Sequence, residues 1–144
     1  MSQDDLVRVS DQVIVTANTH NPETFIDLLA DNFVWYDTTH ADPITTTDEA
    51  RTYVQAWFTA FPDFQAERLD RVVGTDSVAT EVAITATHTG PLTFTGATLP
   101  ATGRAVNFKI VFIATVTSGK VVKFSTHPDI AGIVKQLEAA PGAL

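Results

Sequence analysis

The segment from Thr46 to Pro62 constrains the fold more than any other part of this sequence. Thr46 and Glu49 have the spacing of a capping box, which predicts that a helix begins here. Pro62 ends it. Between these limits apolar residues recur at helical spacing on one face: Ala50, Tyr53, Val54, Trp57, Phe58 and Phe61. Because a face with so many large aromatic side chains has to be buried, the sequence predicts that this helix covers another layer.

After Pro62 the apolar period changes from helical to two-residue, the pattern of strands that bury one face. The predicted strands cover residues 64–74, 78–88, 104–117 and 121–126. Ser118-Gly119-Lys120 forms a tight turn between the last two. His88 falls on the same parity as the buried apolar row of its strand, and Phe112 lies in the corresponding row of the third.

The residues before Thr46 predict two further helices, near residues 4–18 and from Asn21-Pro22-Glu23, and a short strand over 33–37. The second helix is expected to present Phe25, Leu28 and Leu29, and a final short helix begins at Ile130. Helices followed by hairpin-linked strands predict an α+β fold, with one domain spanning residues 1–144.

Composition excludes several classes of function. The chain of 144 residues has a net charge of −8, whereas a phosphate-binding surface needs positive charge, so nucleic acid is not an expected partner. It contains no cysteine, which removes disulfides and thiolate chemistry. No apolar run approaches the roughly 20 residues of a membrane span, and the first residues are acidic without an apolar signal core. A cytoplasmic location is therefore expected.

The surplus of aromatic residues predicts a largely apolar pocket between the helices and the sheet. Its expected substrate-binding residues are Trp35, Asp37, His40, Tyr53, Trp57, Phe61 and Phe112. Tyr36 and Asp37 alternate along a strand, so only one of them faces inward. The four histidines lack helical His-x-x-x-His spacing, and no metal site is expected.

Several segments, in order, resemble the SnoaL-like polyketide cyclase family of the nuclear transport factor 2-like superfamily. The first is Trp57-Phe58-Thr59-Ala60-Phe61-Pro62-Asp63-Phe64, and the second is Thr87-His88-Thr89-Gly90. Pro100-Ala101-Thr102-Gly103-Arg104 and Gly119-Lys120-Val121-Val122 follow, with Asp129 and Gln136-Leu137 at the end. The resemblance implies a cone-shaped fold in which three N-terminal helices pack on a curved, mainly antiparallel sheet.

The resemblance also implies a chemistry. Cyclases of the family close a ring by intramolecular aldol condensation without metal or organic cofactor, and an aspartate near the end of the last strand is the base. Asp129 matches that position within His127-Pro128-Asp129, so the implied catalytic residues are Asp129, His127 and His88. The sequence departs from the family in Phe112-Ile113-Ala114-Thr115, which contains no histidine or glutamine, whereas the cyclases place further polar side chains on this strand.

For Asp129 and His88 the residues themselves allow a second interpretation. Aspartate is a favoured helix N-cap, and a helical pattern begins at Ile130, so Asp129 caps this helix, acts as a base, or does both. His88 is a pocket-lining donor or a core histidine bonded to a neighbour.

Three functions remain open at this stage. The leading one is an enzyme that abstracts a proton α to the carbonyl of a small hydrophobic substrate, leading to aldol cyclisation or isomerisation. The second is a non-catalytic module that binds a small molecule in the same pocket. An epoxide hydrolase is a third, although no arginine falls on a clearly inward strand position. Val111 and Ile113 lie on the parity opposite the core, which predicts a homodimer or higher homo-oligomer through the sheet.

Overall fold

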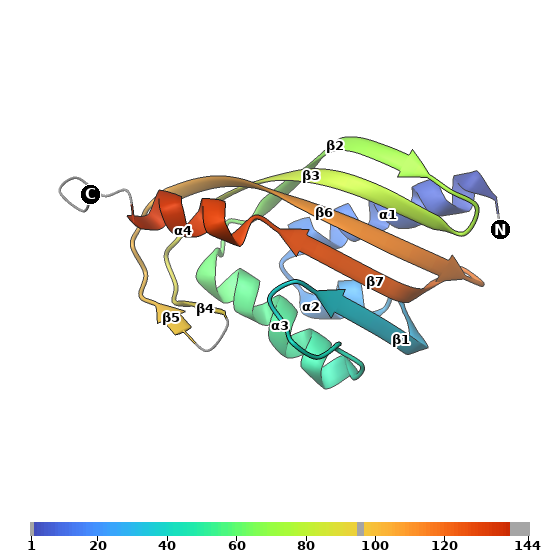
Figure 1. Cartoon of the computed structure of the whole chain (residues 1–144), viewed down its shortest axis with the longest axis horizontal. Coiled ribbons are helices and arrows are strands. Elements are labelled where there is room, and N and C mark those ends of the chain that lie inside the picture. Colours follow the sequence, from blue (N-terminus) through green and yellow to red (C-terminus); the bar gives the residue numbers. More distant parts are fainter. Residues whose placement is uncertain (1, 95–96, 139–144) are drawn as a thin grey trace.

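A computed structural model describes residues 2–94 and 97–138 (Figure 1). The helices are α1 (Gln3–Thr19), α2 (Pro22–Ile26), α3 (Thr47–Ala60) and α4 (Ile130–Glu138). The strands are β1 (Leu29–Asp37), β2 (Gln65–Val73), β3 (Ser77–Thr87), β4 (Leu92–Phe94), β5 (Ala97–Leu99), β6 (Ala105–Thr117) and β7 (Lys120–Pro128). Within the described ranges, no helix combines the length and apolar character needed to cross a membrane.

Five of the strands form one curved sheet in the order β1-β7-β6-β3-β2 (Figure 1). The hairpin neighbours pair antiparallel, whereas β1 lies parallel to β7 at the edge. α1, α2 and α3 lie on one side of this sheet, and α4 follows the end of β7 and contacts β6 (Figure 1). This α+β arrangement, with helices packed on a curved sheet, confirms the predicted fold class.

The predicted aromatic helix is α3. The Thr46 hydroxyl oxygen accepts a hydrogen bond from the Glu49 backbone N–H over 3.2 Å, so the N-cap forms as its sequence predicts. The Trp57 ring stacks on Phe108 of β6 with ring centroids 5.8 Å apart. The layer that α3 covers is therefore the concave face of the sheet.

The structure corrects the predicted boundary between the second helix and the first strand. α2 ends at Ile26, so Leu28 lies beyond the helix and Leu29 begins β1. The Val121 backbone N–H donates to the Leu28 carbonyl oxygen over 2.9 Å, and Leu29 pairs with Val121. Parallel pairing with β7 draws Leu28 and Leu29 out of the predicted helix and extends β1. The local sequence does not predict this pairing, because the two strands are distant in the chain.

The last strand is also longer than predicted. β7 continues to Pro128, which pairs with Ile110 of β6. The turn before it has the predicted position, and Ser118 and Gly119 both have positive φ, as two-residue hairpin turns require. The short strands β4 and β5 were not predicted, because three-residue strands carry almost no periodic signal.

Gly90 shows why one of the motifs contains glycine. A Cβ at this position would lie 1.9 Å from the Thr59 carbonyl oxygen at the end of α3. The Gly90 backbone N–H donates to the Ala60 carbonyl oxygen over 3.2 Å, which ties the chain after β3 to the C-terminus of α3. Only a residue without a side chain permits this approach.

Candidate functional site

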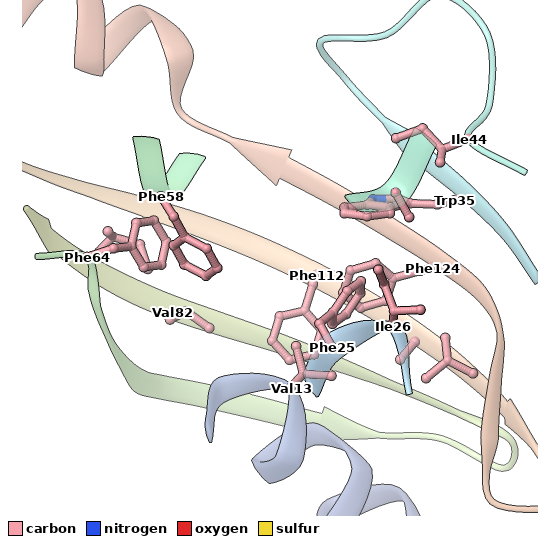
Figure 2. Close-up of a cluster of buried hydrophobic side chains, with 14 of the residues drawn as sticks. Val13, Phe25, Ile26, Trp35, Ile44, Phe58, Phe64, Val82, Phe112 and Phe124 are labelled. Atoms are coloured by element: carbon pink, nitrogen blue, oxygen red, sulfur yellow. The ribbon is translucent and has the colours of Figure 1, made fainter. Parts of the chain in front are cut away.

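The cavity between the helices and the concave sheet face has a volume of about 130 Å³. Its aromatic wall consists of Phe25, Trp35, Tyr53, Trp57, Phe58, Phe64, Phe112 and Phe124. Figure 2 shows Phe25, Phe112 and Phe124 grouped beside Val13 of α1, while Phe58 and Phe64 pair at another part of the same core. Among the described residues, Asp37 is the only charged one in the lining, and Thr16, Tyr53 and Thr126 carry its hydroxyl groups.

Strand alternation decides which residue of the Tyr36-Asp37 pair enters the cavity. Asp37 is 5% exposed and faces inward, whereas Tyr36 is 49% exposed on the opposite face. Asp37 is the last residue of β1 and pairs with Thr126 of β7, so the parallel pairing brings both side chains to one place. The prediction that only one of the two residues faces inward is therefore met by Asp37.

The two carboxylate oxygens of Asp37 have different partners. Oδ2 accepts hydrogen bonds from the hydroxyl groups of Tyr53, over 2.7 Å, and Thr126, and both of these residues line the cavity. Oδ1 accepts from the Thr39 backbone N–H over 2.8 Å and from the Thr39 hydroxyl. Four donors thus hold the buried anion in one orientation, with Oδ2 on the cavity side.

Tyr53 is a hydrogen-bond donor rather than a base. Burial raises the pKa of its phenol well above the ordinary value, and the negative charge of Asp37 raises it further. The hydrogen-bonding groups of Thr39 and Trp57 oppose this shift only in part. Because Tyr53 stays protonated at neutral pH, Asp37 is the one group of the cavity lining that can accept a proton.

Thr126 completes the polar end of the cavity. Its hydroxyl oxygen accepts a hydrogen bond from the Trp35 indole N–H over 2.8 Å while its own proton goes to Asp37. Sequence reasoning did not single out Thr126. The signal was present, because Phe124, Thr126 and Pro128 alternate along β7 and all three line the cavity.

The structure places Asp129 one residue beyond β7 and outside the cavity lining. Its Oδ1 accepts the Gly132 backbone N–H over 3.0 Å at the start of α4, which is the contact of an N-cap. Its neighbour His127 is exposed and pairs with Val111, on the parity opposite Thr126. The geometry therefore shows Asp129 as a helix cap. Its role as a catalytic base, which the resemblance implies, stays a prediction.

His88 is fully buried but does not line the cavity. The Thr102 backbone N–H donates to Nδ1 over 3.2 Å, which assigns the ring proton to Nε2. Nε2 has no hydrogen-bond partner among the described residues. Burial lowers the pKa of the imidazole, and the Gly90 backbone offsets only part of this effect. The ring lies 5.6 Å from that of Phe61.

The other predicted substrate-binding residues divide into two groups. Trp35, Asp37, Tyr53, Trp57 and Phe112 line the cavity. Phe61 is buried behind the lining against Trp57, and His40 lies outside it with a half-exposed ring. The His40 ring makes an edge contact with Tyr53, with centroids 4.6 Å apart, and its Nδ1 is 3.7 Å from Asp37 Oδ1.

Within residues 2–94 and 97–138, no three histidine, aspartate or glutamate side chains come close enough to hold a metal ion. Asp37 and His40 form a pair without a third such group. What the cavity offers is one carboxylate, two hydroxyl donors that contact it, and apolar walls.

Comparisons with known proteins agree with the sequence resemblance. The model of the SnoaL-like polyketide cyclase family matches residues 5–137. No curated protein matches this sequence.

Solved structures share the fold. AclR, a candidate hydroxylase from Streptomyces galilaeus, has a TM-score of 0.82 at 23% identity over 97% of this chain and 85% of its own. IdmH, a candidate polyketide cyclase from Streptomyces antibioticus, has a TM-score of 0.76 at 24% identity over 91% and 96%. An LEH-like epoxide hydrolase from M. tuberculosis has a TM-score of 0.67 at 13% identity over 93% and 90%.

Proposed function

Because the chain belongs to the SnoaL-like polyketide cyclase family, we propose that it is an enzyme that abstracts a proton α to a carbonyl group, with Asp37 as the base. The observation that carries the proposal is the contact between Asp37 Oδ2 and the Tyr53 hydroxyl at 2.7 Å on the wall of an apolar cavity. At this separation the carboxylate can accept the α-hydrogen of a substrate while the Tyr53 hydroxyl donates to the carbonyl oxygen of the same molecule.

Substrate entry changes the hydrogen bonding of Asp37. A carbonyl oxygen placed beside Tyr53 and Thr126 competes with Asp37 for their hydroxyl protons. When these donors turn to the substrate, Asp37 Oδ2 is free to approach the α-hydrogen. The substrate that needs the base therefore also exposes it.

The reaction then begins with a proton transfer. The α-hydrogen moves to Asp37 Oδ2 as a proton, and the electron pair of the broken C–H bond forms the C=C bond of an enolate. The carbonyl π pair moves to oxygen, where the hydroxyl groups of Tyr53 and Thr126 stabilise the negative charge. In an aldol closure the enolate carbon attacks a second carbonyl, and the alkoxide that forms takes the proton back from Asp37. In an isomerisation the proton returns from Asp37 to another carbon.

The resemblance-derived assignment of Asp129 and His127 as catalytic residues has less geometric support. Asp129 is occupied as a helix cap, and neither residue lines the cavity. The epoxide hydrolase alternative lacks support as well, because within residues 2–94 and 97–138 no arginine lines the cavity.

A solvent-exchange experiment tests the proposal. The probe is 2-tetralone, a neutral ketone whose α-hydrogens exchange slowly with D₂O and are followed by NMR. We expect the wild-type protein to accelerate this exchange and Asp37→Asn to lose most of the acceleration while it remains folded. Binding of 2-tetralone without accelerated exchange would instead support the alternative, a non-catalytic binding module.

A further inference from the structure

We propose that the substrate is a neutral carbonyl compound of one or two rings with a single polar end, and that the reaction is an isomerisation rather than a ring closure. This inference rests on the proposed function and specifies the ligand of the same cavity. It follows from the size of the cavity, from the position of its polar groups, and from the sign of its one charge.

Volume limits the size of the ligand. A cavity of about 150 Å³ binds benzene, so the cavity of about 130 Å³ accommodates roughly one ring within its walls. A one-ring ketone matches this volume, whereas a linear arrangement of three or four fused rings far exceeds it.

Polarity limits the number of oxygen atoms. The polar groups that contact Asp37 gather at one end, where β1 and β7 lie side by side and α3 supplies Tyr53. Thr16 is the remaining hydroxyl of the lining, and it donates to the Val13 carbonyl oxygen over 2.7 Å. The remaining polar group of the lining is the Trp57 indole N–H, which acts on the Tyr53 hydroxyl and so belongs to the same end. Away from that end a second buried oxygen on the ligand would lack a partner, at a cost of about 1–3 kcal/mol.

Charge excludes acids. Of the residues that the structure describes, Asp37 is the only charged one in the lining, which includes neither lysine nor arginine. A carboxylate ligand would therefore bring a second negative charge beside Asp37 in a poorly solvated site, which is strongly unfavourable.

The single polar end of the cavity also favours isomerisation of the enolate over aldol closure. An intramolecular aldol closure needs a second carbonyl, and its oxygen would be among apolar side chains. With one carbonyl and a neighbouring double bond, the proton leaves the α-carbon for Asp37 Oδ2 and returns to the γ-carbon. The double bond moves into conjugation, and atoms and electrons balance without an oxidant or co-reactant.

Both tryptophans of the chain, Trp35 and Trp57, line the cavity, so their fluorescence reports its occupancy. We expect 2-tetralone and 2-cyclohexen-1-one to quench this fluorescence. The three-ring ketone anthrone and the anion 2-naphthoate should bind at least tenfold more weakly than 2-tetralone. The conversion of 3-cyclohexen-1-one to its conjugated isomer, followed by ultraviolet absorbance, should be accelerated by the wild-type protein.

A cavity-filling variant tests the size limit independently of charge. Ala66 lines the cavity on β2, at the opposite edge of the sheet from β1. Ala66→Leu should weaken 2-tetralone binding at least tenfold more than 2-cyclohexen-1-one binding. The matched control is Ala131→Leu on the exposed side of α4, outside the lining.

The outcomes separate this inference from the proposed function. Anthrone or 2-naphthoate binding as tightly as 2-tetralone would overturn the substrate class, even if α-hydrogen exchange is catalysed. If the ligands bind in the predicted order but neither exchange nor isomerisation is accelerated, the cavity selects this class of ligand without catalysis. That result would refute the proposed function and leave the ligand class supported.

Discussion

The Tyr53 phenol on α3 donates a hydrogen bond to Asp37 Oδ2 on β1 over 2.7 Å, so one contact joins the helical layer to the edge of the sheet. The same contact places a proton donor beside the only carboxylate of the cavity lining. This pair therefore contributes to the stability of the fold and to the proposed reaction. Its removal should change both the free energy of unfolding and the rate of α-hydrogen exchange.

Replacement Tyr53→Phe removes this donor and leaves Asp37 with its other three hydrogen bonds. Hydrogen bonds to charged groups contribute about 1.5–3 kcal/mol, so we expect the free energy of unfolding in urea to fall by about 2 kcal/mol. The matched control is Tyr36→Phe on the exposed face of β1, which should change it by less than about 0.5 kcal/mol. Equal effects of the two replacements would show that the buried contact contributes no stability.

Asp129 allows its two interpretations to be separated. Replacement Asp129→Ala removes the acceptor of the Gly132 N–H, and loss of an N-cap costs about 1 kcal/mol of unfolding free energy. Asparagine caps helices nearly as well, so Asp129→Asn should keep the wild-type stability. Because asparagine cannot act as a base, loss of α-hydrogen exchange in a stable Asp129→Asn protein would favour the catalytic role that the family resemblance implies.

His88 makes stability depend on pH. Burial lowers the pKa of its imidazole in the folded protein, whereas the unfolded chain takes up this proton near the ordinary pKa of about 6.5. Below that pH the unfolded state binds more protons, so this contribution to stability is complete above the unfolded pKa and is lost as the pH falls. The slope is at most about 1.4 kcal/mol per pH unit.

Urea unfolding between pH 5 and 8, at values chosen around the histidine pKa, measures this slope. We expect His88→Gln to unfold with a weaker pH dependence than wild type, whatever its absolute stability. His127→Gln is the control, because His127 is exposed on β7. An unchanged pH dependence in His88→Gln would contradict the assignment.

The predicted homodimer through the sheet has a specific candidate surface. Ala79, Ile113, Ser125 and Tyr36 pair across β3, β6, β7 and β1 to form one row on the face opposite the cavity. Ile113 is 39% exposed and Tyr36 is 49% exposed, so the row carries apolar surface that a second copy could cover.

Sedimentation analysis tests this surface. We expect the wild-type chain to sediment as a dimer or a higher oligomer, and Ile113→Lys to shift it towards the monomer by placing a charge in the apolar row. The control, Gln55→Lys, adds the same charge at an exposed position of α3. A wild-type monomer, or an Ile113→Lys protein that keeps the wild-type mass, would refute an interface at this row.

The candidate site shows where sequence reasoning works and where it fails. The aromatic wall around Trp57 follows from helical spacing, and the alternation of Tyr36 and Asp37 limits the inward position to one of them. The family motif directs attention to Asp129, yet the extension of β7 to Pro128 carries that residue past the cavity. The strand end depends on pairing with Ile110, which is distant in sequence.

The sequence by itself determined the layers of this protein, because helical and two-residue periodicities are local properties that specify which face of each element is apolar. Only the tertiary structure decided which polar groups meet inside. Asp37, Tyr53 and Thr126 come from β1, α3 and β7. Tyr53 and Thr126 both contact Asp37 because β1 pairs in parallel with β7 and α3 packs against the same face of the sheet. Such a parallel contact joins segments separated by most of the chain, so no local pattern of residues specifies it.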